Sequence, residues 1–331
     1  MKLGLCGIGC GGFAQTFSAA MAGLRGELDL YFASRDLSRA RAFATRYNGA
    51  DAFGSYQAAA ADSRVDALYI CTPHHLHLEH AALAARQRKH ILLEKPIAHT
   101  LEDAQAITAK ARSAGVTLMV AENARFLPPV RKAKELIDEG RLGQIRLIQL
   151  QEQYPFQPSG WRNQAKLNGG GVFIDGGIHT ASLLTYLAGY PNQVYAMALL
   201  PGQPGLEAED GIMVMTRSAI GVVGMINHSW SAAPATPRPW VSISGTKSNI
   251  YFEMGSPRLK VIDAGSTETI DLDDDDHTGL AAMVQEFRQS ILEGREPSMS
   301  GAGGIDDLAL VLKAYESVEV GVPLPLRGLG E

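Results

Sequence analysis

The first 120 residues alternate short apolar runs with stretches of helical periodicity, and this alternation limits most strongly what the chain can fold into. Strands that alternate with helices are typical of βαβ units, whose strands pair in parallel. We expect strands at Lys2–Cys6, Asp29–Ala33, Ala67–Cys71, His90–Leu93 and Thr117–Ala121. We expect helices at Phe13–Ala22, Leu37–Arg46, Leu76–Gln87 and Leu101–Ser113. Residues 1–122 are therefore predicted to form an α/β domain built on a doubly wound parallel sheet.

The pattern changes after Glu122, because most of the next strand signals have no regular helix between them. Strands are expected at Ile145–Glu152, Val194–Leu199, Gly211–Thr216, Val222–Trp230, Trp240–Gly245 and Leu259–Asp263. Helices are expected at Val130–Glu139, Gly171–Leu187, Leu280–Glu293 and Ile305–Val318. Strands joined by turns favour antiparallel pairing. Residues 123–331 are therefore predicted to form an α+β domain with a large, mostly antiparallel open sheet.

Charge and cysteine content argue against several classes of protein. The net charge is −5 and the isoelectric point is about 6.0, so there is no basic field to attract nucleic acid or anionic lipid. No apolar run approaches the roughly 18 residues that span a bilayer, and the N-terminal residues do not read as a signal peptide. Cys6, Cys10 and Cys71 show no disulfide spacing, which favours the reducing cytoplasm. We expect a cytoplasmic protein without nucleic-acid or membrane partners.

A glycine-rich turn follows the first predicted strand. The run Gly7-Ile8-Gly9-Cys10-Gly11-Gly12 fits G-x-G-x-x-G, and Phe13 begins the helix after it. Between a strand and a helix, this pattern is typical of a dinucleotide-binding turn. Gly7 is expected to permit the tight turn, Gly9 to let the backbone approach the pyrophosphate, and Gly12 to allow close helix–strand packing. The helix N-terminus would offer N–H groups to the phosphates.

The end of the second predicted strand bears on which dinucleotide is bound. NAD-binding domains usually have Asp or Glu about 20 residues after the glycines, to bind the ribose 2′-hydroxyl. This chain has Ser34-Arg35 there, followed by Arg39. An acidic side chain would repel a 2′-phosphate, whereas Ser and Arg can bind it. The sequence therefore favours NADP, with NAD as the alternative if Asp36 takes the acidic role and Arg35 stacks on adenine.

Further motifs lie at the ends of predicted elements. Cys71-Thr72-Pro73-His74 ends one strand, with His77 beyond it, and Glu94-Lys95-Pro96 ends the next. Residues 169–179 read GGGVFIDGGIH, residues 141–143 read RLG, and residues 314–317 read AYES. In this order, together with the N-terminal glycines, these motifs resemble the glucose–fructose oxidoreductase/inositol dehydrogenase (Gfo/Idh/MocA) family over nearly the whole chain.

The resemblance implies an NAD(P)-dependent oxidoreductase whose substrate is a sugar, a sugar derivative or a cyclitol. It also implies a cis Lys95–Pro96 peptide and self-association through the second sheet, as a homodimer or homotetramer. It supports cofactor contacts at Thr72, Pro73, His74, His77, Glu94 and Lys95.

Three residues are candidates for catalysis. Ligands of open α/β sheets bind beyond the carboxyl ends of the strands, where Lys95 could stabilise the alkoxide that develops as hydride leaves. The alternative is an ordinary solvent-facing lysine. Asp175 and His179 share one face of a helix, so His179 could exchange the hydroxyl proton while Asp175 orients it or binds substrate. Alternatively, Asp175 caps a helix that begins at Gly176-Gly177, and His179 is a packed neighbour.

Four residues are weaker candidates for substrate binding. Asn123 and Arg125 lie at the predicted domain junction, where the family places substrate contacts. Trp161 could stack on a sugar ring and Arg162 could bond to it. Trp161 and Arg162 could equally be structural anchors.

Three other clusters do not favour a metal site. The four histidines at 74, 75, 77 and 80 open a helix, and no histidine completes a site with Cys6 and Cys10. The acidic run Asp273–Asp276 lacks the glycine and terminal glutamate of a calcium loop, so it is interpreted as a solvated loop. We expect no metal.

Hydride transfer between the nicotinamide and a sugar hydroxyl or keto carbon is thus the leading hypothesis. A redox-neutral glycosidase or epimerase that retains NAD, or a non-catalytic sensor with the same fold, are the alternatives.

Overall fold

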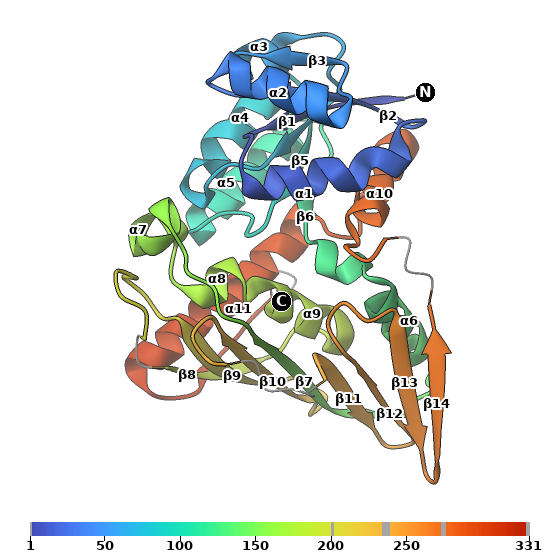
Figure 1. Ribbon diagram of the computed structural model, residues 1–331. Helices are drawn as coiled ribbons and strands as arrows, with labels where there is room; N and C mark the ends of the chain where they lie inside the picture. Colours follow the sequence, from blue (N-terminus) through green and yellow to red (C-terminus); the bar gives the residue numbers. More distant parts are fainter. Residues whose placement is uncertain (1, 200–201, 234–238, 273–275, 329–331) are drawn as a thin grey trace. The chain divides into compact units, whose positions relative to one another are not determined.

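The computed structural model describes residues 2–199, 202–233, 239–272 and 276–328 (Figure 1). The chain forms two compact units. The first unit comprises Met1–Asn123 and Leu280–Ile305, and the second comprises Ala124–Gly279 and Asp306–Glu331. The first boundary lies one residue from the predicted one, but residues 280–305, which we expected in the second domain, belong to the first unit.

The first unit is built on a six-stranded parallel sheet with the strand order β3-β2-β1-β4-β5-β6. The strands are β1 (Leu3–Ile8), β2 (Leu28–Ala33), β3 (Asp51–Phe53), β4 (Ala67–Ile70), β5 (His90–Glu94) and β6 (Leu118–Ala121). Every residue of β4 is buried, as expected for a parallel sheet with both faces covered. The predicted α/β fold is confirmed. The three-residue β3 was missed because its residues are exposed or half-buried and carry no apolar run.

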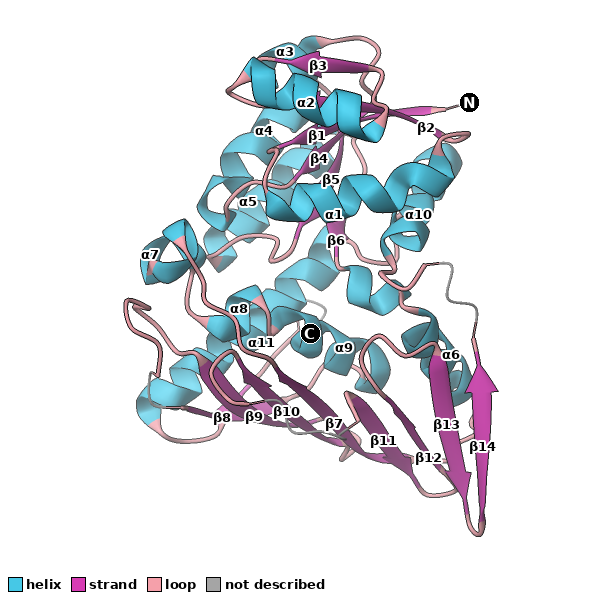
Figure 2. Cartoon of the chain, viewed as in Figure 1, coloured by secondary structure: helices cyan, strands magenta, loops and turns pink. Residues whose placement is uncertain are grey.

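Helices flank this sheet (Figure 2), and three of them begin at residues that favour a helix start. They are α1 (Gly12–Ala20), η1 (Met21–Leu24), α2 (Leu37–Tyr47), α3 (Tyr56–Ala61), η2 (His74–Leu76), α4 (His77–Arg86) and α5 (Leu101–Ala114). The side chains of Asp36, Ser55 and Thr100 accept hydrogen bonds from the first turns of α2, α3 and α5. Helix α5 ends at Gly115 in the left-handed conformation. The short helix α3 was not predicted.

The segment 280–305 belongs to the first unit because it packs on α1 and pairs with β6. Helix α10 (Leu280–Glu293) contacts α1 and η1, and Arg288 forms an ion pair with Glu27 at 3.1 Å. The extended residues after it pair with β6, where Val120 N donates to Met299 O at 2.9 Å. Helix α11 (Gly301–Val320) then leads into the second unit.

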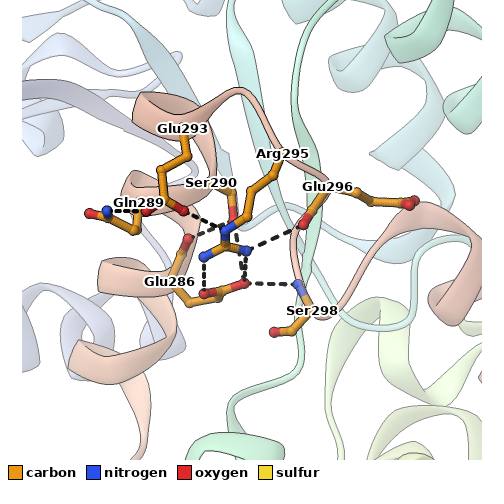
Figure 3. A network of polar contacts seen from close by, with 7 residues as sticks. All are labelled: Glu286, Gln289, Ser290, Glu293, Arg295, Glu296 and Ser298. Atoms are coloured by element: carbon orange, nitrogen blue, oxygen red, sulfur yellow. Dashed lines mark hydrogen bonds and ion pairs between the residues drawn. The ribbon is translucent and has the colours of Figure 1, made fainter.

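A cluster of ionic contacts holds the turn after α10 (Figure 3). The Arg295 guanidinium donates to both carboxylate oxygens of Glu286, each at 2.8 Å, and to Glu293 at 2.6 Å. Glu286 also accepts from Ser298 N at 2.9 Å. Arg295 lowers the pKa of the Glu286 carboxyl to about 2. The turn that returns the chain to β6 is therefore stabilised by a charge network.

The second unit is built on a nine-stranded sheet with the order β14-β13-β12-β11-β7-β10-β9-β8-β15, which is antiparallel except where β7 and β10 pair in parallel. The strands are β7 (Ile145–Gln153), β8 (Gln193–Ala198), β9 (Gly211–Arg217), β10 (Val223–Ser229), β11 (Val241–Gly245), β12 (Asn249–Phe252), β13 (Arg258–Asp263), β14 (Ser266–Asp271) and β15 (Leu324–Pro325). The predicted mostly antiparallel sheet is confirmed. Strands β12, β14 and β15 were not predicted.

Helices cover one face of this sheet, and the alternation of buried and exposed residues follows from that. Helix α9 (Ile178–Ala188) packs on β7 and β10. Along β9, Ile212 and Val214 are buried, whereas Met213 and Met215 on the other face are exposed. The remaining helices are α6 (Pro128–Asp138), α7 (Ala165–Asn168) and α8 (Val172–Asp175), with short 3₁₀ turns η3 (Asn123–Phe126) and η4 (Gly160–Asn163).

The single helix predicted over Gly171–Leu187 is wrong, because the structure breaks it into α8 and α9 at Gly176-Gly177. Both Gly176 N and Gly177 N donate to Val172 O at 2.9 Å, and His179 N donates to Gly176 O at 3.3 Å. The regular i to i−4 ladder is therefore interrupted between Asp175 and His179.

Candidate functional site

The carboxyl ends of the parallel strands bring half of the predicted cofactor residues to one edge of the sheet. Strands β1, β2, β4 and β5 end at Ile8, Ala33, Ile70 and Glu94. The predicted cofactor residues that follow these ends within three residues are Gly9, Ser34, Arg35, Thr72, Pro73 and Lys95. Since ligands of such sheets bind beyond the carboxyl ends of the strands, these residues form one candidate cofactor site.

The structural roles of the glycines in and around this turn differ from the predicted ones. Gly9 has φ of +100°, and a side chain there would place its Cβ 2.5 Å from Cys71 O, so glycine is required. Gly7 lies inside β1 and not in the turn that we predicted for it. At Gly12, no heavy atom of the described residues lies within 4 Å of an added Cβ. The close packing predicted for Gly12 is therefore wrong, and the tight approach falls on Gly9.

The start of α1 fits a bound pyrophosphate. The N-cap residue is Gly11, which has no side chain to cap the helix, and an added Cβ at Gly11 would meet no heavy atom of the described residues within 4 Å. The helix N-terminus thus presents backbone to open space on this side, where a dinucleotide phosphate would be favoured. Phe13, the second residue of α1, is 38% exposed.

Asp36 is engaged in capping α2. Its Oδ1 accepts from Ser38 N at 2.9 Å, from Ser38 Oγ at 2.6 Å and from Arg39 N at 3.4 Å. The Ser38 hydrogen bonds lower the pKa of the Asp36 carboxyl. Arg35 and Arg39 are exposed, while Ser34 is buried and its Oγ accepts from Asp36 N at 3.2 Å. One carboxylate oxygen of Asp36 therefore already accepts the hydrogen bonds that cap α2.

His77 links the end of β4 to the turn after β5. Its Nδ1 lies 3.0 Å from Pro96 O and its Nε2 lies 2.9 Å from Thr72 O, and the residue is fully buried. Burial lowers the pKa of His77 to about 4, and the contacts with the Thr72 and Pro96 carbonyls oppose that shift. This geometry favours a structural role over the cofactor contact that we predicted. The Lys95–Pro96 peptide beside it is cis, as expected.

Two neighbouring polar pairs complete this edge. Thr72 Oγ1 lies 2.9 Å from His80 Nδ1, and the His80 ring packs edge-on against Tyr56. Tyr69 OH donates to Glu94 at 2.5 Å, directly before Lys95. His74 is buried, and Lys95 is half-buried. Glu94 is thus buried against Tyr69 and fixes the backbone next to Lys95.

In the second unit, Asp175 is the last residue of α8 and is buried. The Arg162 guanidinium donates to its Oδ2 at 2.8 Å and also lies 4.5 Å from the centre of the Trp161 ring. Arg162 and Trp161 therefore join Asp175 in one cluster. The N-cap of α9 is Gly177, which has no side chain, so the alternative in which Asp175 caps the next helix stays a prediction. His179 is half-buried in the first turn of α9.

Aromatic residues enclose the glycine next to Asp175. A Cβ at Gly176 would lie 2.8 Å from His228 Nε2 and 3.2 Å from Tyr154 OH, and Trp230 Nε1 donates to that hydroxyl at 3.1 Å. Burial, with the nearby Glu152 charge, raises the pKa of Tyr154 to about 12. Glycine is required here because larger residues would push these rings away.

Two residues that the sequence did not single out for a role hold α8. Glu209 accepts hydrogen bonds from Gly171 N and Phe173 N, and the Tyr315 hydroxyl donates to it at 2.8 Å. Tyr315 belongs to the AYES motif that we used only for the resemblance. Glu209 lies in a loop with no motif, so no sequence signal marked it.

Arg125 is enclosed by its own unit. Its Nε donates to Ser182 Oγ at 2.7 Å, and its Nη2 donates to Thr185 Oγ1 at 3.0 Å and to both Asp307 oxygens at 3.0 and 3.1 Å. These bonds favour a structural role over the substrate contact that we predicted. Asn123 is half-buried at the end of the first unit.

Two predicted features concern metals and membranes. Most of the acidic run Asp273–Asp276 lies outside the described residues. Within the described ranges, no three His, Cys, Asp or Glu side chains gather in a way that could hold a metal ion. In the same part of the chain, no helix is both long and apolar enough to cross a membrane.

Comparison with known families matches both units. Residues 2–122 match the model of an oxidoreductase family with an NAD-binding Rossmann fold, and residues 130–251 match the Gfo/Idh/MocA C-terminal domain. The chain belongs to the Gfo/Idh/MocA oxidoreductase family. Among relatives of this family, 1,5-anhydro-D-fructose reductase of Ensifer adhaerens is 29% identical over 87% of this chain and 88% of its own length. D-xylose 1-dehydrogenase (NADP⁺) 2 of Haloferax volcanii is 27% identical over 89% and 90%.

Solved structures with the same fold are also similar to this chain. Levoglucosan dehydrogenase in complex with NADH and levoglucosan superposes with a TM-score of 0.90 at 24% identity, over 98% of this chain and 99% of that one. Aldose–aldose oxidoreductase of Caulobacter crescentus, complexed with glycerol, superposes with a TM-score of 0.90 at 24% identity, over 98% and 100%. At this level of identity the likeness establishes the fold.

Proposed function

We propose that the chain catalyses hydride transfer between NAD(P) and a hydroxyl or keto carbon of a sugar, a sugar derivative or a cyclitol. The observation that carries the proposal is the position of Lys95, directly after β5, at the sheet edge that also holds the Gly9 turn. A cation at this edge lies where the family fold binds the nicotinamide dinucleotide. The names of the relatives, which are reductases and dehydrogenases of sugars, support the substrate class.

We assign roles to five side chains of this chain. Lys95 donates to the substrate oxygen and stabilises negative charge on it. His179 accepts the hydroxyl proton in the oxidation direction and returns it in reduction, and Asp175 orients the reacting groups. Trp161 and Arg162 bind the sugar, while Arg162 also holds Asp175. The bound nicotinamide supplies the hydride chemistry.

Replacing Lys95 by methionine tests this proposal. Turnover should fall by about 10²–10³-fold, the usual cost of losing one donor to a developing oxyanion, while cofactor affinity stays near that of the wild type. Levoglucosan, D-xylose and 1,5-anhydro-D-fructose are assayed with both nicotinamide dinucleotides through the absorbance of the reduced form. Lys110→Met, an exposed lysine on α5, is the matched control. Wild-type turnover in the Lys95→Met enzyme would refute the proposal.

We further propose that the cofactor is NADP. Two exposed arginines, Arg35 and Arg39, follow the end of β2 and can bind a 2′-phosphate, while Asp36 is engaged in its capping bonds. Replacing Arg35 and Arg39 together by alanine should raise the KM for NADP at least about tenfold, equivalent to the loss of one good phosphate contact, with little effect on the KM for NAD. Arg41→Ala, exposed on the same helix, is the control. A wild-type enzyme with a clear preference for NAD would refute this assignment.

We also propose a cytoplasmic homodimer or homotetramer that associates through the helix-free face of the second sheet. Met197, Met213 and Met215 are 61%, 47% and 49% exposed on adjacent strands of that face. Exposed apolar groups concentrated in this way are typical of an association surface. The three free cysteines, of which Cys6 and Cys10 are buried, suit a reducing compartment.

A further inference from the structure

Two residues supply hydrogen-bond partners for every N–H group in the first turn of α8. Gly171 N donates to Glu209 Oε2 at 3.0 Å, and Phe173 N donates to Oε1 at 2.9 Å. Val172 N donates to the Glu209 backbone carbonyl at 2.9 Å. Ile174 N donates to the Tyr315 hydroxyl at 3.0 Å. These four groups would otherwise lack partners at the start of a helix.

The two partners are also bonded to each other and enclosed by protein. The Tyr315 hydroxyl donates to Glu209 Oε1 at 2.8 Å while it accepts from Ile174. Burial raises the pKa of the Glu209 carboxyl above its ordinary value, and the hydrogen bonds from Phe173, Tyr315 and Gly171 oppose that rise. Burial and the nearby carboxylate raise the pKa of the Tyr315 phenol well above its usual range. The hydroxyl therefore stays protonated and continues to donate.

The glycine run before α8 is shaped by these same two residues. A Cβ at Gly170 would lie 2.5 Å from the Tyr315 ring, and a Cβ at Gly171 would lie 2.0 Å from Glu209 O. Only glycine lets the backbone come so close at these two positions. The glycines of this motif are thus explained by their contacts with Glu209 and Tyr315 in the same unit.

Helix α8 is too short to hold itself in place. It has four residues, and a single turn is unfavourable in isolation because few hydrogen bonds compensate for the ordered backbone. Asp175 is its last residue, so the position of the Asp175 carboxylate depends on what anchors the first turn. At the other end, the Asp175 side chain is bonded to Arg162.

We propose that Glu209 and Tyr315 are positioning residues that act through α8 to hold Asp175, and the residues after it, for hydride transfer. This inference rests on the function proposed above, because it concerns how Asp175 and His179 are placed for that reaction.

Two variants test the pair. Tyr315→Phe keeps the ring but leaves Ile174 N–H without its acceptor, and Glu209→Gln keeps the side-chain length but brings an amide donor towards backbone N–H groups. Tyr190→Phe is the matched control, because the Tyr190 hydroxyl is buried without a hydrogen-bond partner among the described residues. Amide hydrogen exchange is measured on the full-length protein without substrate. In both test variants, exchange in residues 171–176 should accelerate at least about tenfold, and elsewhere it should stay near that of the wild type.

Kinetics separate positioning from simple stability. With the sugar that wild-type enzyme turns over best among levoglucosan, D-xylose and 1,5-anhydro-D-fructose, kcat of both variants should fall about tenfold or more while the KM for the cofactor stays unchanged. Each kcat is divided by the fraction of folded protein, which is measured from the native tryptophan emission. This emission reports on the second unit, because all three tryptophans, at 161, 230 and 240, lie there. Deuteration of the reacting carbon should slow the variants more than the wild type, since hydride transfer becomes rate-limiting.

Each result has a separate meaning. Unchanged exchange in residues 171–176 overturns the proposal, as does faster exchange with a wild-type kcat. A lower kcat that disappears on normalisation shows a purely structural role and also overturns it. Turnover retained by Lys95→Met instead refutes the proposed function. The hydrogen-exchange result then still decides whether Glu209 and Tyr315 hold α8 in place.

Discussion

Replacement of Arg125 by methionine would remove a guanidinium that joins three parts of the second unit. The side chain comes from the turn η3, and its partners Ser182 and Thr185 lie on α9 while Asp307 lies on α11. The side chains of Arg125 and Asp307 are only 13% and 3% exposed. Methionine retains an apolar stem of similar length, so the variant tests the charged group more than the packing.

The expected cost follows from the burial of the Asp307 carboxylate. Removing one partner of a buried ion pair typically destabilises a protein by about 3–5 kcal/mol, because the other charge remains buried. Asp307 would retain the hydrogen bond from Thr185 Oγ1 at 2.7 Å. A hydrogen bond from a neutral hydroxyl compensates only in part for the loss of a guanidinium that contacts both carboxylate oxygens. We therefore expect Arg125→Met to lower the free energy of unfolding of the second unit by about 3 kcal/mol or more.

Urea unfolding followed by tryptophan emission measures this quantity, because Trp161, Trp230 and Trp240 all report on the second unit. Arg146→Met, on the exposed side of β7, is the matched control. The double variant Arg125→Met/Asp307→Asn should be more stable than the sum of the two single effects predicts, since the two residues share one interaction.

A loss of stability below about 1 kcal/mol, the range of exposed pairs, combined with a large increase in the sugar KM, would refute this reasoning. That outcome would instead support the substrate-binding role that we predicted for Arg125 from its position in the sequence.

Three other predictions concern the first unit and the exposed sheet. Arg295→Ala should lower stability at neutral pH. The pKa of Glu286 is lowered from 4.5 to about 2 in the folded state. The difference in stability between Arg295→Ala and the wild type should therefore shrink as the pH falls from 4.5 towards 2. A difference in thermal midpoint that does not change with pH would contradict this prediction. Gly9→Ala should raise the dissociation constant for reduced nicotinamide dinucleotide at least about tenfold by fluorescence titration, because its Cβ meets Cys71 O, whereas Gly23→Ala, which has open space among the described residues, should not. Met213→Glu should shift the protein towards monomer in light scattering, since a charge would be buried in the association surface, and an unchanged mass would exclude this face.

Local periodicity was sufficient to predict most of the fold. A buried parallel strand is a short apolar run and an amphipathic helix has its own spacing, so both patterns are visible in neighbouring residues. Predicted strands such as Asp29–Ala33 and Gly211–Thr216 were confirmed to within a residue or two. The missed strands, β3, β12, β14 and β15, have two to six residues, and several are largely exposed, so they have little apolar pattern.

The candidate site was predicted less evenly. Gly9, Lys95 and Asp175 were singled out because motifs of known spacing surround them, and the roles of Lys95 and Asp175 stay predictions. His77 and Arg125 were also found, but their sequence positions could not show that their polar atoms face Pro96 and Asp307 instead of a ligand. Glu209 was missed because it lies in a loop and acts on a helix 38 residues away.

The sequence by itself thus determined the parallel sheet, the antiparallel sheet, the glycine turn and the family, because each depends on residues close together in the chain or on ordered motifs. Only the tertiary structure decided which polar side chains pair with one another. It placed Arg125 on Asp307, 182 residues away, and Tyr315 on Ile174, 141 residues away. It also joined residues 280–305 to the first unit. These pairings satisfy buried charges and N–H groups, and their partners are chosen by proximity in space, which the order of residues along the chain does not express.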